Sequence, residues 1–491
     1  MRDWVVIAPE DSVAIAVNAV ATGSTLPGGG QTLEDIPAGH KVALVDIAAG
    51  ARVIKYANPI GIAKTAIRRG QWVHEHNLKT GLEGMLEYAW NPREDASATQ
   101  TEAEMPGFMG YARPDGQVGI RNELWILPGV GCVSHTATRI AQAARQRFAD
   151  CFTDVVSFTH PFGCSQSGCD AVMTRDLIAA LAQNPNAACV LVLGLGCEVN
   201  RLSQLMPLMN GAPHIVGFEA QMVEDEVAHA LELIAPIAEK ARVQQRVPMP
   251  LSKLRVGLKC GGSDGYSGLT ANPLLGAFCD ATAAWGGSCA MSEVPEMFGA
   301  EQLLMNRAVS REIFDKLTAM INGYKEYFLR HGEAVYDNPS PGNRDGGITT
   351  LEEKSLGCTQ KSGGAPVVDV LNYAQRMAQP GLSLVWGPGN DMIACTALAA
   401  AGCQLILFTT GRGTPYGGPV PTMKIATNSA LAQRKPGWID FNAGMLLEGV
   451  PMARACEELV SAVAAVASGQ PARCETYGYR EIAIFKDGVI Q

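Results

Sequence analysis

A polar segment, residues 91–104 (NPREDASATQTEAE), divides the 491-residue chain into two parts with different hydrophobic patterns. Before this segment, short apolar runs alternate with turn signals such as the glycines at 28–30, which is typical of a compact, mostly β module. After it, strand-like apolar runs are followed by helix-like amphipathic runs, and this alternation favours parallel sheets covered by helices. The chain therefore predicts a multidomain protein in which a small all-β domain precedes a large α/β region with mostly parallel sheets.

The same patterns predict the domain boundaries. We expect the all-β domain over 1–90, a solvated linker over 91–105, one α/β domain over 106–247 and a second over 248–491. The last boundary rests on the stretch VPMP at 247–250, which follows a helix-like run over 224–242 that Pro236 should kink. The expected strands lie at 124–127, 155–158, 189–193, 254–258, 383–385 and 405–408, and the expected helices at 134–147 and 171–182.

Composition excludes several classes of protein. Lys and Arg total 39 against 48 for Asp and Glu, and a net charge of −9 is the wrong sign for a surface that binds nucleic acid. No apolar run approaches the roughly 18 residues of a membrane-spanning helix. The chain holds 14 Cys but opens without a signal-peptide pattern, so we expect a cytoplasmic protein with free thiols. A homodimer is the default expectation for such a protein.

Four cysteines each stand next to a glycine after a strand-like apolar run: Cys132, Cys164, Cys197 and Cys260. Ligands of open α/β sheets bind beyond the carboxyl ends of the strands, so these cysteines could converge in a metal or iron–sulfur site. The alternative is that each is a small buried residue that packs a tight turn. No Cys-x-x-Cys pair is present, so local spacing does not indicate a metal.

The expected β domain offers histidines at His40, which precedes Lys41, and in the string His74-Glu75-His76-Asn77. Residues two apart on a strand face the same side, so His74 and His76 could hold one metal ion or one substrate carboxylate. The neighbouring lysine would lower the pKa of His40 and leave it neutral as a base. Solvent-exposed loop histidines and a surface turn are the alternatives.

Three glycine-rich loops follow expected strands: 260–268 (CGGSDGYSG), 387–391 (GPGND) and 411–418 (GRGTPYGG). Glycine lets successive backbone N–H groups point at an anion. None of the loops matches a nucleotide-binding fingerprint. We therefore predict a site for a small polyhydroxy acid, with tight connections between strands as the alternative.

Long strings of this chain resemble the altronate/galactarate dehydratase family almost end to end. The most specific are CGGSDGYSGLTANP at 260–273 and ITTLEEKSLGCTQKSG at 348–363, together with THPFGCSQ at 159–166. The resemblance implies an N-terminal β-clip domain of the SAF type and a large C-terminal dehydratase region.

The resemblance also implies a reaction, the dehydration of a sugar acid to a 2-keto-3-deoxy acid supported by Fe²⁺. Manganese is an alternative metal and an iron–sulfur cluster an alternative form. The intact His-x-His-Asn string at 74–77 resembles the altronate branch, which implies a hydro-lyase of hexuronate catabolism that converts D-altronate to 2-dehydro-3-deoxy-D-gluconate. Galactarate dehydratase, sulfolactate sulfo-lyase and a non-catalytic sugar-acid-binding protein remain open alternatives.

Such a β-elimination needs a base, stabilisation of the enediolate charge and assistance to a poor leaving group, which a Lewis-acid metal can provide. His40, Lys41 and His160 are the candidate catalytic residues. Lys41 and Arg412 are candidate carboxylate partners, and His74 and His76 are the leading candidate metal ligands, with the four cysteines as the rival site. The candidate substrate contacts are Ser263, Asp264, Arg412 and Thr414.

Overall fold

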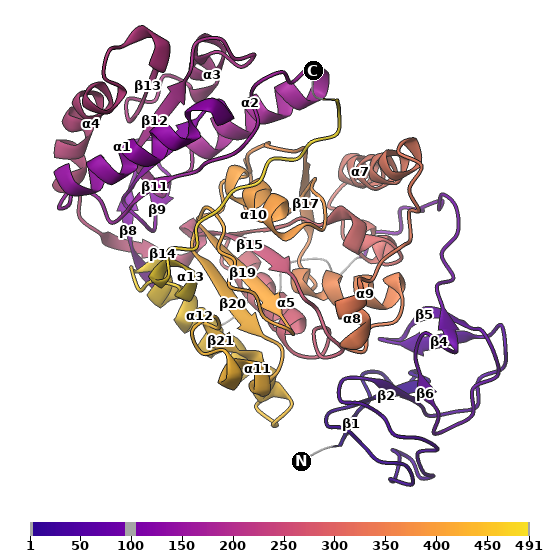
Figure 1. Cartoon of the computed structure of the whole chain (residues 1–491). Helices are drawn as coiled ribbons and strands as arrows, with labels where there is room; N and C mark the ends of the chain where they lie inside the picture. The colour runs from indigo at the N-terminus through magenta and orange to yellow at the C-terminus, as the bar shows by residue number, and fades with distance from the viewer. Residues whose placement is uncertain (1–2, 94–104, 490–491) are drawn as a thin grey trace.

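The computed structural model describes residues 3–93 and 105–489, and within them the chain forms three domains (Figure 1). A small β domain lies at one end, the second domain lies at the other, and the third domain lies between them. This arrangement confirms a small all-β domain followed by a larger α/β region with parallel sheets. Of the expected linker, 91–105, residues 94–104 lie outside the described residues.

The first domain consists of short strands in two antiparallel sheets, with the orders β1-β2-β3-β6 and β4-β5-β7. Its apolar residues alternate with turn glycines, and the small core is filled by branched side chains such as Val53, Ile60 and Val73. The strands are β1 Trp4–Val5, β2 Val13–Ala16, β3 Lys41–Ala43, β4 Arg52–Lys55, β5 Asn58–Ala63, β6 Trp72–Val73 and β7 Leu78–Lys79.

The second domain is built on a parallel sheet of order β11-β10-β12-β13. Its strands β10 and β12 are buried along their whole length, as expected for a parallel sheet covered on both faces. Helix α1 has the bounds expected from the sequence, and Pro236 lies inside α4. The elements are β10 Glu123–Pro128, α1 Ser134–Arg147, β11 Val155–Ser157, α2 Gly168–Ala182, β12 Ala187–Gly194, α3 Leu202–Leu205, β13 Ile215–Glu219 and α4 Glu226–Arg242.

A separate antiparallel sheet, β14-β8-β9, links the second domain to the third. Its strands are β8 Gly107–Ala112, β9 Val118–Gly119 and β14 Val247–Pro250. The boundary expected at 247 thus falls at a strand that pairs with the start of the second domain. The domain boundaries themselves stay predictions.

The third domain contains a seven-stranded, wholly parallel sheet of order β17-β18-β16-β15-β19-β20-β21. The strands are β15 Arg255–Cys260, β16 Ser288–Met291, β17 Val367–Leu371, β18 Gly381–Val385, β19 Leu405–Thr410, β20 Thr422–Ala426 and β21 Phe441–Asn442. The helices are α5 Ala271–Ala284, α6 Glu301–Met305, α7 Arg311–Arg330, α8 Pro341–Asp345, α9 Leu351–Thr359, α10 Asp391–Ala400, α11 Ser429–Arg434, α12 Met452–Ala467 and α13 Arg473–Thr476.

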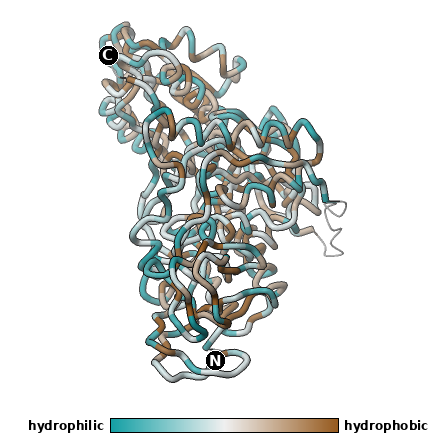
Figure 2. Tube along the Cα trace, turned by 90° about the vertical axis from the view of Figure 1, so that its right-hand side faces the viewer, coloured by the Kyte–Doolittle hydropathy of each residue, from teal (hydrophilic) through white to brown (hydrophobic). Residues whose placement is uncertain are grey.

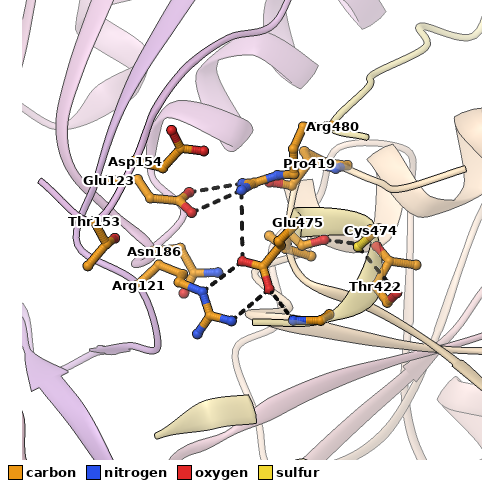
Figure 3. Close-up of polar contacts among 12 residues, drawn as sticks. Arg121, Glu123, Thr153, Asp154, Asn186, Pro419, Thr422, Cys474, Glu475 and Arg480 are labelled. Carbon is orange, nitrogen blue, oxygen red and sulfur yellow. Dashed lines mark hydrogen bonds and ion pairs between the residues drawn. The ribbon is translucent and has the colours of Figure 1, made fainter. Parts of the chain in front are cut away.

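The second and third domains share a hydrophobic core. Trp125 and Leu177 of the second domain belong to the same buried cluster as Leu398 and Ile406 of the third. A buried polar network reinforces the contact: the guanidinium of Arg480 donates to Glu123, and the network extends to Arg121 and Glu475 (Figure 3). These two domains therefore form one packed body.

The chain after α13 runs back across the third domain and ends against the second (Figure 1). There the backbone N–H groups of Asp487 and Gly488 donate to Asp170 at the start of α2. The two ends of the chain consequently lie at opposite ends of an elongated molecule (Figure 2). None of the helices in the described ranges combines the length and apolarity needed to cross a bilayer.

Candidate active site between the first and third domains

Helix α9 is buried on every side although it carries Glu352, Glu353 and Lys354. Charged side chains are almost never fully buried unless they are paired. Thr350 caps the N-terminus of the helix, since its hydroxyl accepts a hydrogen bond from the backbone N–H of Glu353, and the helix packs against β5 of the first domain. The partners of these charges therefore lie where the first and third domains meet.

The carboxylate of Glu353 accepts hydrogen bonds from two lysines of the first domain. Nζ of Lys41 lies 2.8 Å from Oε2, and Nζ of Lys55 lies 2.8 Å from Oε1. Lys41 also donates to the carbonyl of Gly347 at 2.7 Å and to Oγ1 of Thr349 at 2.9 Å. Burial lowers the pKa of Lys41 to about 8. Burial opposes ionisation of Glu353, but the two lysines lower its pKa to about 2.

His40 and His74 lie beside these lysines, in a cluster with Trp72. Nδ1 of His40 accepts a hydrogen bond from the indole N–H of Trp72, so its Nε2 is the donor to the carbonyl of Asp345 at 3.3 Å. The ring of His74 stacks on Trp72 with an interplanar angle of 13°, and its Nδ1 lies 2.9 Å from Oγ1 of Thr349. Burial, followed by the charge of a neighbouring lysine, lowers both pKa values, that of His74 to about 3. Both rings are therefore neutral at pH 7.

His76 is exposed, and its ring centroid lies 5.2 Å from that of Trp72. Nε2 of His74 lies 3.9 Å from Oε2 of Glu75, whose other carboxylate oxygen pairs with Arg344 at 2.6 Å. In the part of the chain that the structure describes, no three His, Cys, Asp or Glu ligand atoms of this cluster lie within 4.8 Å of one another. As they stand, His74 and His76 offer an incomplete metal site.

His40 and Lys41 of the first domain contact the backbone of the segment at 345–349 in the third domain. A positive φ of +79° at Gly39 turns the first-domain chain toward this segment, where an added Cβ would lie 3.3 Å from the carbonyl oxygen of Gly346. His40 then contacts the carbonyl of Asp345, and Lys41 contacts that of Gly347. Gly346 of this segment lines the large cavity between the first and third domains, whereas His40 and Lys41 do not. The two side chains therefore hold a segment of the cavity wall in place.

A cavity of about 570 Å³ lies between the first and third domains. Its size is within the range of about 300–1,000 Å³ that is usual for small-molecule sites. Val17, Asn18 and Ala38 form the first-domain wall. The third-domain wall includes Asp264, Tyr266, Gly346, Arg412, Asn428, Arg434 and Glu448.

Two arginines on the cavity wall are available to a ligand. Among the described residues, neither Arg412 nor Arg434 has a partner for its guanidinium, and both side chains are exposed. A guanidinium presents paired N–H donors that match a carboxylate. The cavity is therefore suited to an organic acid.

Asp264 is a buried carboxyl group on the same wall. Its oxygens accept hydrogen bonds from the hydroxyls of Ser267 and Thr427, the side-chain amide of Asn428 and the backbone N–H of Tyr266. Burial nevertheless raises the pKa of Asp264 above its ordinary value of 3.8. A carboxyl group with a raised pKa at a cavity wall is a candidate for proton transfer.

The remaining predicted residues lie elsewhere. Ser263 is buried beside a second, very small cavity, and its carbonyl accepts from Asn343. The hydroxyl of Thr414 accepts from the backbone N–H of Tyr416 and does not line the large cavity. His160 belongs to the second domain and is not brought to this site. Both of its ring nitrogens contact backbone groups there, Nε2 the carbonyl of Pro128 and Nδ1 the N–H of Phe162.

The four cysteines of the rival metal site are divided between two sheets. Cys132, Cys164 and Cys197 are exposed and follow β10, β11 and β12 of the second-domain sheet. Cys260 is buried at the end of β15, in the sheet of the third domain. Cys132, Cys164 and Cys197 therefore share the carboxyl edge of one sheet, whereas Cys260 lies at the edge of another.

Sequence reasoning missed Lys55, Glu353 and Arg434. Glu353 lies in the family-like string at 348–363. The available signal there was the run of three charged residues, 352–354, in a helix without an amphipathic pattern, which indicates a buried helix whose charges are paired. Arg434 ends α11 and carried no local signal, because only the packing of α11 places it at the cavity.

Three family models match the chain in succession. Residues 2–81 match the altronate/galactarate dehydratase SAF domain, and residues 110–242 match the second domain of D-galactarate dehydratase/altronate hydrolase. Residues 251–490 match the C-terminal region of D-galactarate/altronate dehydratase. The SAF assignment of the first domain is thereby confirmed.

Curated relatives match over almost the whole length. The chain is 46% identical to an altronate dehydratase of Bacillus subtilis (100% of both chains) and 47% identical to an altronate dehydratase of Escherichia coli (98% of both). It is 34% identical to a galactarate dehydratase (L-threo-forming) of Escherichia coli, over 89% of this chain and 87% of the relative. The chain is therefore a member of the altronate/galactarate dehydratase family.

Proposed function

We propose that this protein is a hydro-lyase that converts D-altronate to 2-dehydro-3-deoxy-D-gluconate and water. The observation that carries the proposal is the interdomain cavity. The guanidiniums of Arg412 and Arg434, which have no partner within the described ranges, share one of its walls with the buried carboxyl group of Asp264. The two altronate dehydratases that match over almost the full length support altronate as the substrate.

The residues of the cavity account for the steps of the reaction. Arg412 and Arg434 hold the substrate carboxylate, which places the neighbouring carbon C2 against the wall. Asp264 accepts the proton from C2, and the electron pair of that C–H bond forms a C2–C3 double bond as the C3–O bond breaks. The departing hydroxide takes the proton from Asp264 and leaves as water, which returns Asp264 to the carboxylate. The resulting enol rearranges to the 2-keto acid.

The proposal includes Fe²⁺ as cofactor, with Mn²⁺ as the alternative metal. His74 and His76 fit this role in part. His74 is neutral, its Nε2 makes no hydrogen bond to any residue that the structure describes, and His76 is exposed two residues away. A bound divalent ion would supply Lewis-acid assistance to the leaving hydroxyl. Together the two histidines supply at most two of the ligands that such an ion needs.

The proposal also includes a cytoplasmic location, a homodimer and a place in hexuronate breakdown. Free thiols at all fourteen cysteines support a reducing compartment. The dimer rests only on the prevalence of twofold assemblies among enzymes of this kind.

The test is an anaerobic assay of the purified protein with added Fe²⁺, in which D-altronate, galactarate and sulfolactate are supplied in parallel and keto acid and sulfite are measured. We expect keto acid from altronate alone. Keto acid mainly from galactarate, or sulfite from sulfolactate, would contradict altronate as the substrate but would still show that the protein is a lyase. Binding of altronate without turnover would favour a sugar-acid-binding protein.

A variant of Asp264 tests whether turnover takes place in the interdomain cavity. Asp264→Asn retains the hydrogen-bonding shape but cannot accept the proton, so kcat should fall by about 10²–10⁴-fold. Asp315→Asn, an exposed carboxylate on α7, is the matched control and should leave kcat unchanged. Full activity of the Asp264 variant would remove it from the mechanism.

A further inference from the structure

Cys260, Glu296 and Cys358 meet in a buried cluster outside the cavity described above. The two Sγ atoms lie 3.0 Å apart, although the residues are separated by 98 positions in the sequence. Oε2 of Glu296 lies 3.3 Å from Sγ of Cys260 and 2.9 Å from Sγ of Cys358. Within the described ranges these are the only three His, Cys, Asp or Glu residues whose ligand atoms all lie within 4.8 Å of one another.

Three different elements hold these ligand atoms. Cys260 ends the central strand β15, Glu296 lies in the turn after β16, and Cys358 lies on the buried helix α9. β15 and β16 are hydrogen-bonded neighbours, so the first two ligands leave the same edge of the sheet. A site on such elements is rigid, and its spacing depends little on loop conformation.

The separations suit one metal ion. Metal–sulfur bonds of about 2.3 Å and metal–oxygen bonds of about 2.0–2.2 Å place tetrahedral ligands roughly 3.4–3.8 Å apart. The three observed separations are shorter than this by less than about 1 Å, so a small outward movement of the side chains accommodates an ion. Two thiolates and a carboxylate are ligands that Fe²⁺ and Zn²⁺ accept.

The charges around the cluster also suit a divalent cation. Three buried lysines pair with three carboxylates: Lys354 with Glu296 at 2.9 Å, Lys361 with Glu293 at 2.6 Å, and Lys259 with Glu293 and Asp391. These charges cancel. Ionisation of the two thiols adds two negative charges, which a divalent ion balances and which burial would otherwise make costly.

A small cavity adjoins the cluster at Cys358. Its volume is about 10 Å³, which is room for about one water molecule, and of the three proposed ligands Cys358 lines it, together with Lys354 and Glu353. Asp264 borders both this small cavity and the large one. Three protein ligands and one open position are the pattern of catalytic zinc-type sites.

We propose that Cys260, Glu296 and Cys358 bind one divalent transition-metal ion, Fe²⁺ or Zn²⁺, with the fourth position open to the small cavity that Asp264 shares with the large cavity. The site is distinct from the His74 and His76 pair, and the inference does not rest on the proposed function, because metal binding is measured without substrate.

The experiment begins with full-length protein purified without oxygen, stripped with a chelator and loaded with Fe²⁺, Zn²⁺ or Co²⁺ in turn. We expect tight uptake of one ion at the thiolate cluster, counted apart from any ion at His74 and His76, with a near-ultraviolet thiolate-to-cobalt charge-transfer band and X-ray absorption that places sulfur at about 2.3 Å from the metal. The absorption measurement uses the unmodified protein, so it decides the ligands even if a variant fails to fold. Ligation by nitrogen and oxygen alone, or failure of the folded protein to bind any of the three ions, would overturn the proposal.

Matched variants separate this site from its rivals. Cys260→Ser and Cys358→Ser should abolish the charge-transfer band and the tightly bound ion. Cys403→Ser removes a thiol of equal burial that is no part of the cluster and should keep both signals. His74→Ala should likewise retain the ion. Loss of the metal from the His74 variant alone, with the cysteine variants still loaded, would move the metal to the histidines and refute the inference.

Discussion

Nζ of Lys41 in the first domain lies 2.8 Å from Oε2 of Glu353 in the third, and both side chains are at most 1% exposed. The other oxygen of the same carboxylate binds Lys55 of the first domain. One buried carboxylate thus fastens two lysines of the β domain to α9. Because the large cavity has one wall on each domain, this contact joins the two domains that form the cavity.

Replacement of Glu353 by Gln should destabilise the protein by about 3–5 kcal/mol, since it leaves two buried lysines without their carboxylate. Denaturant unfolding of the variant measures the change. Asp315→Asn, which breaks the exposed Arg311–Asp315 pair, is the control and should cost less than about 1 kcal/mol. A similar small cost for the Glu353 variant would contradict the importance of the buried pair.

Acidification below pH 6.5 should weaken the fold through His74. Its pKa is lowered from the ordinary 6.5 to about 3, so between these values the unfolded chain binds the proton and the folded protein does not. Stability is therefore fully present above about pH 6.5 and falls as the pH drops toward 3. His40 shifts in the same direction. The melting temperature should fall from pH 7 to pH 5, and less steeply in His74→Gln; equal slopes would show that His74 is not the group that resists protonation.

Substitution of either cavity arginine should weaken substrate binding. Loss of a charge-assisted hydrogen bond costs about 1.5–3 kcal/mol, so Arg412→Gln and Arg434→Gln should each raise KM about 10- to 100-fold. Neither guanidinium has a partner among the described residues, so the melting temperature should hardly change. Arg454→Gln, on the exposed face of α12, serves as control and should leave KM unchanged. An unchanged KM in both cavity variants would place the substrate elsewhere.

Removal of the Arg480 charge should loosen the contact between the second and third domains. The guanidinium of Arg480 binds Glu123 at 2.9 and 3.0 Å, with side chains 5% and 1% exposed (Figure 3). Arg480→Gln leaves the Glu123 carboxylate without its charge partner, which should cost about 3–5 kcal/mol. Hydrogen exchange should rise in the segment at 477–489 before it rises in the first domain. Arg242→Gln, from an exposed pair on α4, provides the comparison; protection equal to that of the native chain would argue against this role.

Local structure was largely readable from the sequence. The amphipathic run at 134–147 predicted α1 with its observed bounds, and the apolar runs at 124–127 and 405–408 lie within β10 and β19. These elements follow from side-chain periodicity, which neighbouring residues determine among themselves. Family membership was also readable, because long specific strings are retained in order along the chain.

The assembly of the sites depends on tertiary structure. The sequence marked Cys260 but paired it with three cysteines of another sheet, whereas the fold places it against Cys358 and Glu296. The contact between these three side chains depends on the strand order β18-β16-β15-β19 and on the packing of α9. Neither the strand order nor this packing produces a periodic pattern in the sequence. Similarly, the sequence marked Lys41 as a catalytic candidate, and the structure gives it a buried partner in Glu353. By itself the sequence determined the secondary-structure elements, their order and the family. The packing of sheets and domains decided which charged and sulfur-bearing side chains face one another, because long-range contacts depend on topology.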